Sequence, residues 1–242
     1  MTLRRILIAT PILLVAAVVA GVAVWWFFIR ETHSLATNAP DIPAKLRATP
    51  GATTASTAAS GGSLTFKIIP ERSEAAYFAD EQLASLPIPD TAKGSTSAIS
   101  GEFRVTADGN LDPSLPAKFA VDLTKLKSDK DMRDRQVQNR GLETSKFPTA
   151  TFTATKVTGW DNSKPAGDEQ DIQLTGMLDL HGVQKEVTWD TKAKRDANVI
   201  TALATLKDIR YDDFNIQKLN IGGFVSVQDT VSIQVSVVAQ QE

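Results

Sequence analysis

The sequence predicts an all-β domain of about eight largely antiparallel strands over residues 63–242, preceded by a transmembrane helix and a tether. Three observations support this prediction. Apolar and polar residues alternate with a period of two, which is typical of strands with one buried and one solvated face. Short turns join most of the alternating runs, as in antiparallel sheets. A stretch of 24 residues without a charge lies near the N-terminus.

The uncharged stretch runs from Ile6 to Ile29 and is flanked by Arg4, Arg5 and Arg30. A helix of this length, at ~1.5 Å per residue, would be about 36 Å long and would cross a hydrocarbon core of roughly 30 Å. Because it exceeds the ~7–15 apolar residues of a cleaved signal peptide, we expect an uncleaved signal anchor over residues 1–30. The preceding arginines predict a cytoplasmic N-terminus and an extracytoplasmic domain, periplasmic or at the cell surface.

Residues 31–62 predict a disordered tether. They are rich in Ala, Thr, Ser and Pro, contain hardly any large apolar residue and show no periodicity. A flexible coil of this length has an end-to-end distance of about 30 Å, so the tether would keep the domain close to the membrane surface.

Within the domain, the apolar members of each alternating run predict one buried face. Turns are expected at Asp108-Gly109 and at His181-Gly182. Two stretches depart from the alternation: residues 80–88 predict a short helix or lid-like loop, and residues 129–139 predict a charged helix. The predicted buried rows are Ile99, Gly101, Phe103 and Val105; Ile172, Leu174, Gly176, Leu178 and Leu180; Val187, Trp189, Thr191 and Ala193; and Val227, Val231, Ile233, Val235 and Val237.

The stretch from Leu126 to Phe152 predicts a crossover between two strands. It leaves one alternating run, passes through the charged helical segment and enters the next run at Phe147-Pro148. Strands that are apolar on one face only either close into a barrel or pack as a sandwich, and alternation alone does not distinguish the two.

Composition excludes several classes of function. The net charge of −2 gives no basic surface for a nucleic-acid partner, and the absence of cysteine excludes disulfides, thiolate metal sites and cysteine nucleophiles. The sequence holds only two histidines, His33 in the predicted tether and His181 at a predicted turn. No histidine cluster for zinc is available, and a Ser-His-Asp triad could form only around His181. We therefore expect neither an enzyme nor a metal or cofactor site.

Several short motifs follow one another along the chain: Leu126-Lys127-Ser128-Asp129, Arg133-Asp134, Leu142-Glu143-Thr144, Phe147–Phe152, Leu174–Leu178, Leu180–Val183 and Val187-Thr188-Trp189. Together they resemble the YceI-like, polyisoprenoid-binding family of lipocalin-type barrels. The resemblance favours the barrel and implies a bound long-chain isoprenoid, such as a polyprenyl lipid or a quinone. The sequence departs from the family pattern at two places. Many members carry His-Leu where this chain has Gln136-Val137, and Asp-Phe-Gly is frequent where this chain has Asp213-Phe214-Asn215.

Under this resemblance, seven aromatic residues and one arginine are the candidate ligand contacts. Arg133 would meet a polar headgroup at the barrel mouth through its two-pronged guanidinium, although a structural ion pair explains it equally well. The alternative function is a structural or stress-response module whose filled barrel binds a protein partner. Whether the domain forms a homodimer stays open. The candidate contacts are Phe66, Tyr77, Phe103, Phe119, Arg133, Phe152, Trp189 and Phe214.

Overall fold

The computed structural model describes residues 33–47, 62–83, 86–106, 108–196, 198–221 and 225–242. The predicted transmembrane helix over residues 1–30 and residues 48–61 of the predicted tether lie outside this described part. Among the described residues, no helix is both long and apolar enough to cross a membrane.

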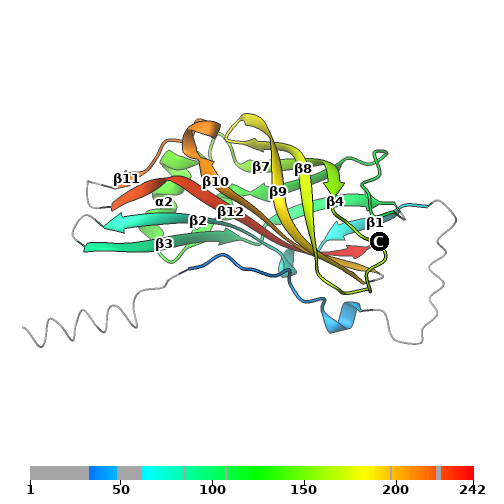
Figure 1. Cartoon of the computed structure of the whole chain (residues 1–242). Coiled ribbons are helices and arrows are strands. Elements are labelled where there is room, and N and C mark those ends of the chain that lie inside the picture. Colours follow the sequence, from blue (N-terminus) through cyan, green and yellow to red (C-terminus); the bar gives the residue numbers. More distant parts are fainter. Residues whose placement is uncertain (1–32, 48–61, 84–85, 107, 197, 222–224) are drawn as a thin grey trace, which may run out of the picture. The chain divides into compact units, whose positions relative to one another are not determined.

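Strands make up most of the described chain, and short helical turns connect some of them (Figure 1). The strands are β1 (Leu64–Ile68), β2 (Glu74–Leu83), β3 (Leu86–Thr96), β4 (Ile99–Val105), β5 (Ala117–Asp122), β6 (Lys127–Ser128), β7 (Thr149–Thr158), β8 (Gln170–Leu180), β9 (Val183–Asp196), β10 (Val199–Arg210), β11 (Asn220–Ile221) and β12 (Val225–Gln241). The helical segments are η2 (Ala44–Leu46), η3 (Pro70–Arg72), η4 (Leu123–Lys125), α2 (Asp131–Gln136), η5 (Val137–Gly141) and η6 (Tyr211–Phe214).

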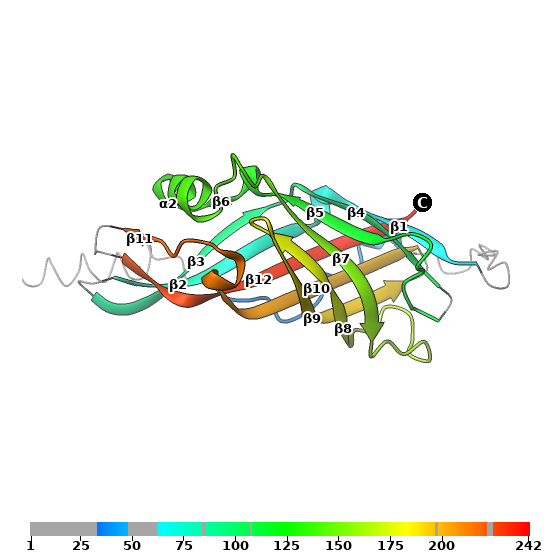
Figure 2. The same ribbon diagram turned by 90° about the horizontal axis from the view of Figure 1, so that it is seen from above.

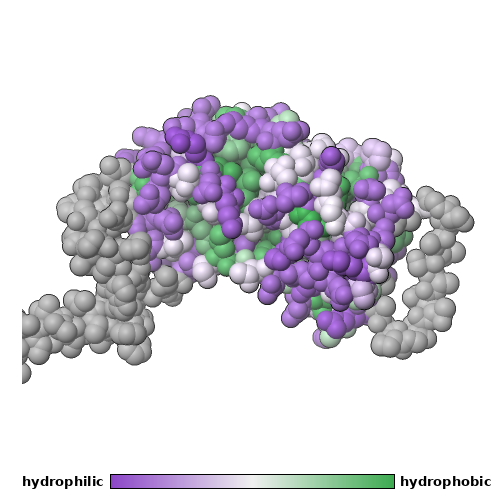
Figure 3. Space-filling view, in the orientation of Figure 1, coloured by the Kyte–Doolittle hydropathy of each residue, from purple (hydrophilic) through white to green (hydrophobic). Residues whose placement is uncertain are grey.

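Eight antiparallel strands close into a barrel, as the family resemblance implies (Figure 2). The hydrogen-bonded order is β1, β4, β5, β7, β8, β9, β10 and β12, and β12 pairs with β1 to complete the ring. Closure leaves no unpaired edge around this ring, which is how barrels satisfy the backbone of a curved sheet. On the face seen in Figure 3, hydrophilic residues cover most of the described surface, consistent with the outward-facing polar rows.

The barrel splits at one end. Strand β12 pairs with β1 near its C-terminus but with β2 from Val225 to Ser236, and β2 continues the sheet into β3 and β6. Helix α2 and η5 belong to the crossover between β5 and β7, and Figures 1 and 2 both place α2 at the end where β3 and β11 lie. The crossover therefore occupies the split end of the barrel.

The crossover helix is confirmed with shifted bounds, since α2 spans Asp131–Gln136 and a π-helical turn follows it to Gly141. The prediction of a short helix or lid-like loop over residues 80–88 is wrong. The described residues of that stretch belong to β2 and β3, which pair with each other. Strand β3 lies near the edge of the sheet and pairs on its other side only with the two-residue β6, so Pro87 and Pro89 remove few ladder bonds.

Residues 34–47, which we call the strap, lie against the outer face of the barrel (Figure 1). The Gln234 side chain accepts a hydrogen bond from the Ala36 amide at 3.0 Å and donates one to the Ala36 carbonyl at 2.9 Å. Ile42 is buried against Val199 and Val238. This part of the expected tether thus follows a defined path on the barrel, while the domain boundaries at 30/31 and 62/63 stay predictions.

Candidate functional site

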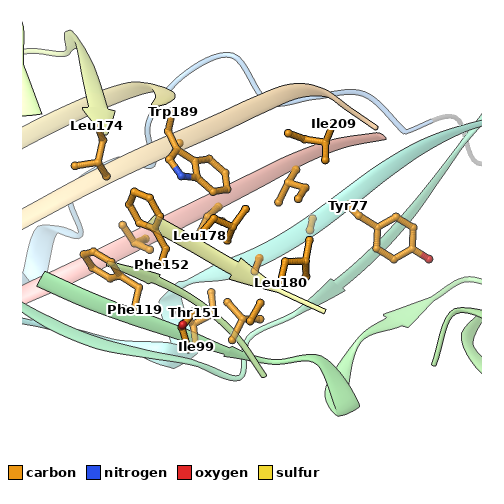
Figure 4. A pocket seen from close by; sticks show the side chains of 18 of the residues that line it. Tyr77, Ile99, Phe119, Thr151, Phe152, Leu174, Leu178, Leu180, Trp189 and Ile209 are labelled. Carbon is orange, nitrogen blue, oxygen red and sulfur yellow. The ribbon is translucent and has the colours of Figure 1, made fainter. Parts of the chain in front are cut away.

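A cavity of about 330 Å³ lies inside the barrel (Figure 4). Ile200 and Ile209 both line it from β10, and nine residues at ~3.3 Å each separate them by roughly 30 Å along the strand. The cavity is therefore long and slender, and its volume lies within the range of small-molecule pockets. The filled interior assumed by the alternative function is not what the structure shows.

All four predicted buried rows contribute to the cavity wall. All five apolar residues predicted on β12 line it, from Val227 to Val237. On β8, Ile172, Leu174, Leu178 and Leu180 line it as well. Period-two alternation therefore identified the lumen-facing side of these strands correctly.

Five aromatic rings from five strands form a continuous band, which we call the aromatic belt. Neighbouring ring centroids along it are 5.7, 5.7, 6.3 and 5.8 Å apart, within the range of favourable aromatic contacts. Figure 4 shows Phe119, Phe152 and Trp189 side by side. In order, the belt consists of Phe66 (β1), Phe103 (β4), Phe119 (β5), Phe152 (β7) and Trp189 (β9).

Glycines on the wall let two belt rings lie against the backbone. A Cβ at Gly101 would come within 2.8 Å of Phe119 Cδ1, and one at Gly176 within 2.8 Å of Phe152 Cζ. Each ring occupies the space that the missing side chain leaves. The lumen stays open even though the rings fill these two positions.

At the split end, Arg133 forms an ion pair with Glu81, and both side chains are only 14% exposed. Arg133 Nη1 also contacts Asp129. Burial alone would lower the pKa of Arg133, but the hydrogen bonds and charges of the two carboxylates outweigh it and raise the pKa. Because two carboxylates already neutralise Arg133, its guanidinium has little capacity left for a lipid headgroup.

The neighbouring Asp134 has different partners. Its carboxylate is buried and accepts hydrogen bonds from the Ser128 amide at 2.8 Å and the Ser128 hydroxyl at 2.7 Å. Arg133 therefore ties α2 to β2, whereas Asp134 ties α2 to β6. The two residues of the Arg-Asp motif hold the crossover to the barrel by separate bonds.

At the opposite end, Arg195 lines the cavity from β9. It occupies the lumen-facing position after Ala193, and its guanidinium carbon lies 5.8 Å from the Phe66 ring centroid. The side chain is partly buried, and burial lowers the pKa of Arg195. Sequence analysis missed this residue, although continuing the alternation through Trp189, Thr191 and Ala193 by one step would have found it.

Six of the eight candidate contacts line the cavity: Tyr77, Phe103, Phe119, Arg133, Phe152 and Trp189. Phe66 is fully buried beside the lumen and does not line it. Phe214 is buried in η6, where His181 Nδ1 lies 3.1 Å from its carbonyl oxygen and Lys185 lies over its ring. Contact of these residues with a ligand stays a prediction.

His181 and Gly182 form the β8–β9 turn, as expected, with positive φ angles of 54° and 74°. Across the described residues no group of His, Cys, Asp and Glu side chains is arranged to hold a metal ion. Sequence analysis missed the contribution of the crossover to the cavity wall, which comes from Leu126, Val137, Gly141 and Leu142.

Comparisons with known proteins agree with this architecture. The model of the YceI-like domain matches residues 66–239. A UPF0312 protein of Vibrio vulnificus is 33% identical over 97 residues, covering 40% of this chain and 47% of the relative. Protein YceI of Salmonella arizonae is 42% identical over 73 residues, covering 30% of this chain and 32% of the relative. The chain thus spans about half or less of the length of these relatives.

Two solved structures share the fold. A polyisoprenoid-binding domain from Saccharophagus degradans, implicated in plant cell wall breakdown, has a TM-score of 0.55 at 17% identity, with 74% of this chain and 99% of that chain covered. BcnA of Burkholderia cenocepacia has a TM-score of 0.51 at 19% identity, with 72% and 99% covered. At these identities the likeness concerns the fold alone.

Proposed function

The chain belongs to the YceI-like domain family, and from this premise we propose that it binds one long-chain isoprenoid, such as a polyprenyl lipid or a quinone, inside its barrel. The observation that carries the proposal is the long cavity with an apolar wall. The description of the Saccharophagus structure as a polyisoprenoid-binding domain supports the choice of ligand class. The proposed function is sequestration or carriage without bond making.

The energetics favour a carrier that selects its lipid rather than one that withdraws lipid strongly from the membrane. Moving a chain out of water gains about 0.8 kcal/mol per methylene, but a bilayer provides the same gain. Selectivity must then come from the length of the lumen, its width and the polar groups at its ends.

We also propose that residues 1–30 anchor the protein in a membrane and that the barrel is extracytoplasmic. The uncharged stretch from Ile6 to Ile29 and the arginines before it support this arrangement. Tethering would raise the effective concentration of the barrel near its lipid source.

Native mass spectrometry of the full chain, released from a mild detergent, tests the proposed function. The wild type should carry one lipid per chain. Ala204 lies on the lumen face of β10 opposite Val235, so Ala204→Trp should plug the lumen and abolish the bound mass. Thr188→Trp is the matched control, because Thr188 is exposed on the outer face and pairs there with Thr175. Equal lipid on both variants, or none on the wild type, would contradict the proposal.

A further inference from the structure

The charged side chains of the cavity wall differ in how they are neutralised. At the split end, Arg133 bonds both oxygens of Glu81 and also contacts Asp129. At the opposite end, the Arg195 guanidinium has no hydrogen bond and no ion pair with any residue that the structure describes. The wall thus contains three arginines: Arg133, which two carboxylates compensate; Arg195, which is partly buried and uncompensated; and Arg210, whose side chain is exposed.

The position of Arg195 is fixed by the fold. Its pairing partner on β10 is Ile200, which lines the cavity, and the alternate residues Ala193 and Thr191 line it too. Side chains at these positions share one face of the sheet. The main-chain carbonyl of Arg195 accepts a hydrogen bond from the Gly167 amide at 2.8 Å, which holds the end of β9 in place.

An unpaired guanidinium that is partly buried loses part of its hydration, which costs free energy. Arginine keeps its charge in proteins, so it does not escape the desolvation penalty by losing a proton. The Phe66 ring, 5.8 Å away, offers a cation–π contact that offsets part of the penalty. That contact uses none of the five N–H donors of the guanidinium.

An anionic oxygen group is the partner that best matches an unpaired guanidinium. Phosphate and carboxylate oxygens accept two parallel hydrogen bonds from guanidinium and neutralise its charge, whereas a neutral hydroxyl or quinone carbonyl neutralises nothing. Arg195 lies on the wall away from the split end, so a lipid that fills the lumen would place one of its ends near it. We propose that this end of the cavity binds the anionic headgroup of the lipid, a phosphate or a carboxylate. This inference rests on the proposed function and specifies its ligand as an acidic lipid whose tail lies in the apolar lumen.

Binding of two probes with the same chain, farnesyl phosphate and farnesol, tests the headgroup. The full chain in a non-ionic detergent is titrated with each probe and with inorganic phosphate alone. The wild type should bind farnesyl phosphate at least tenfold more tightly than farnesol. Arg195→Gln should remove this preference while leaving farnesol affinity within about twofold, and Arg195→Lys should restore part of it. Arg104→Gln is the matched control, because Arg104 points outward from β4 and bonds Thr65 and Ser114.

The possible results separate the headgroup assignment from the proposed function of lipid binding. Equal binding of both probes to the wild type would retain lipid binding and overturn the headgroup assignment, and this comparison needs no variant. If Arg195→Gln lost affinity for farnesyl phosphate and farnesol equally, the headgroup assignment would also be overturned. Competition by inorganic phosphate as strong as that by farnesyl phosphate would assign the site to a free anion instead. Failure of both lipids to bind would reject the proposed function itself and the headgroup with it.

Discussion

Arg133 and Glu81 form a two-pronged ion pair, with Arg133 Nε 3.1 Å from one carboxylate oxygen and Nη2 3.0 Å from the other. The pair joins the crossover helix to β2 at the split end of the barrel. Its atoms are mostly shielded from water, so it contributes more than an exposed ion pair would. Arg133 is thus a structural link between the crossover and β2, and its contact with a lipid headgroup stays a prediction.

Breaking this pair from one side should lower stability. We expect Arg133→Met to reduce the free energy of unfolding by about 2 kcal/mol, because Glu81 is left partly buried without its partner. Urea denaturation followed by circular dichroism measures the effect. Adding Glu81→Leu should recover part of the loss, and a double variant less stable than Arg133→Met would contradict this account.

The Gly94 position should control the shape of the lumen near Tyr77. A Cβ at Gly94 would lie 2.3 Å from Tyr77 Cε1, so Gly94→Ala should push the tyrosine ring away from the wall and destabilise the domain by about 1–3 kcal/mol. Thermal unfolding reports the change. Replacing the ring as well, in Gly94→Ala with Tyr77→Leu, should relieve the clash, and a double variant that is no better would reject the steric explanation.

Alkaline pH should destabilise the domain through its tyrosines. Burial raises the pKa of Tyr77 above its usual range and raises the pKa of Tyr211 to about 12. An unfolded tyrosine has a pKa of about 10, so this contribution to stability is complete below pH ~10 and decreases as pH rises toward the folded-state values.

These are the two tyrosines of the sequence, so tyrosinate absorbance follows them without background from others. The folded chain should titrate later than the urea-unfolded chain. The variant Tyr77→Phe with Tyr211→Phe should lose less stability between pH 10 and 12 than the wild type. Identical pH profiles for the two proteins would contradict the assignment.

The strap should stabilise the outer wall of the barrel. Gln234 is buried beneath it, bonding the Ala36 main chain and the Thr205 hydroxyl. We expect Gln234→Leu to cost about 1–2 kcal/mol and to speed amide hydrogen exchange at Ala36. Gln228→Leu, at an exposed position of the same strand, is the control. Unchanged exchange at Ala36 would show that the strap does not depend on Gln234.

The strands and their inward faces could be predicted because the pattern that reveals them lies within each strand. Each strand alternates between water and lumen, so Val227 to Val237 and Ile172 to Leu180 reveal their inward faces without any partner strand. The His181-Gly182 turn is likewise a property of two adjacent residues with positive φ. Closure itself came from the family resemblance, because alternation does not separate a barrel from a sandwich.

The features that the sequence did not reveal depend on contacts between segments that are distant in sequence. Pro87 and Pro89 interrupt the alternation and concealed the β2–β3 hairpin, which tolerates them because β3 is nearly an edge strand. In the sequence, Gln234 looks like a solvent-exposed residue on the outer face of a strand, and only the fold shows that the strap covers it. Glu81 as the partner of Arg133 lies 52 positions away in sequence, and no spacing rule connects them.

Intermolecular NOEs between a bound prenyl chain and methyl-labelled full-length protein, in deuterated detergent, test the lumen as the binding site most directly. Ile233 and Val235 line the cavity from β12, whereas Val238 on the same strand packs under the strap with Ile42. The account predicts NOEs from the chain to the Ile233 and Val235 methyl groups and none to Val238. NOEs confined to Val238 and other outer-face methyl groups would show that the lipid binds outside the barrel and would contradict it.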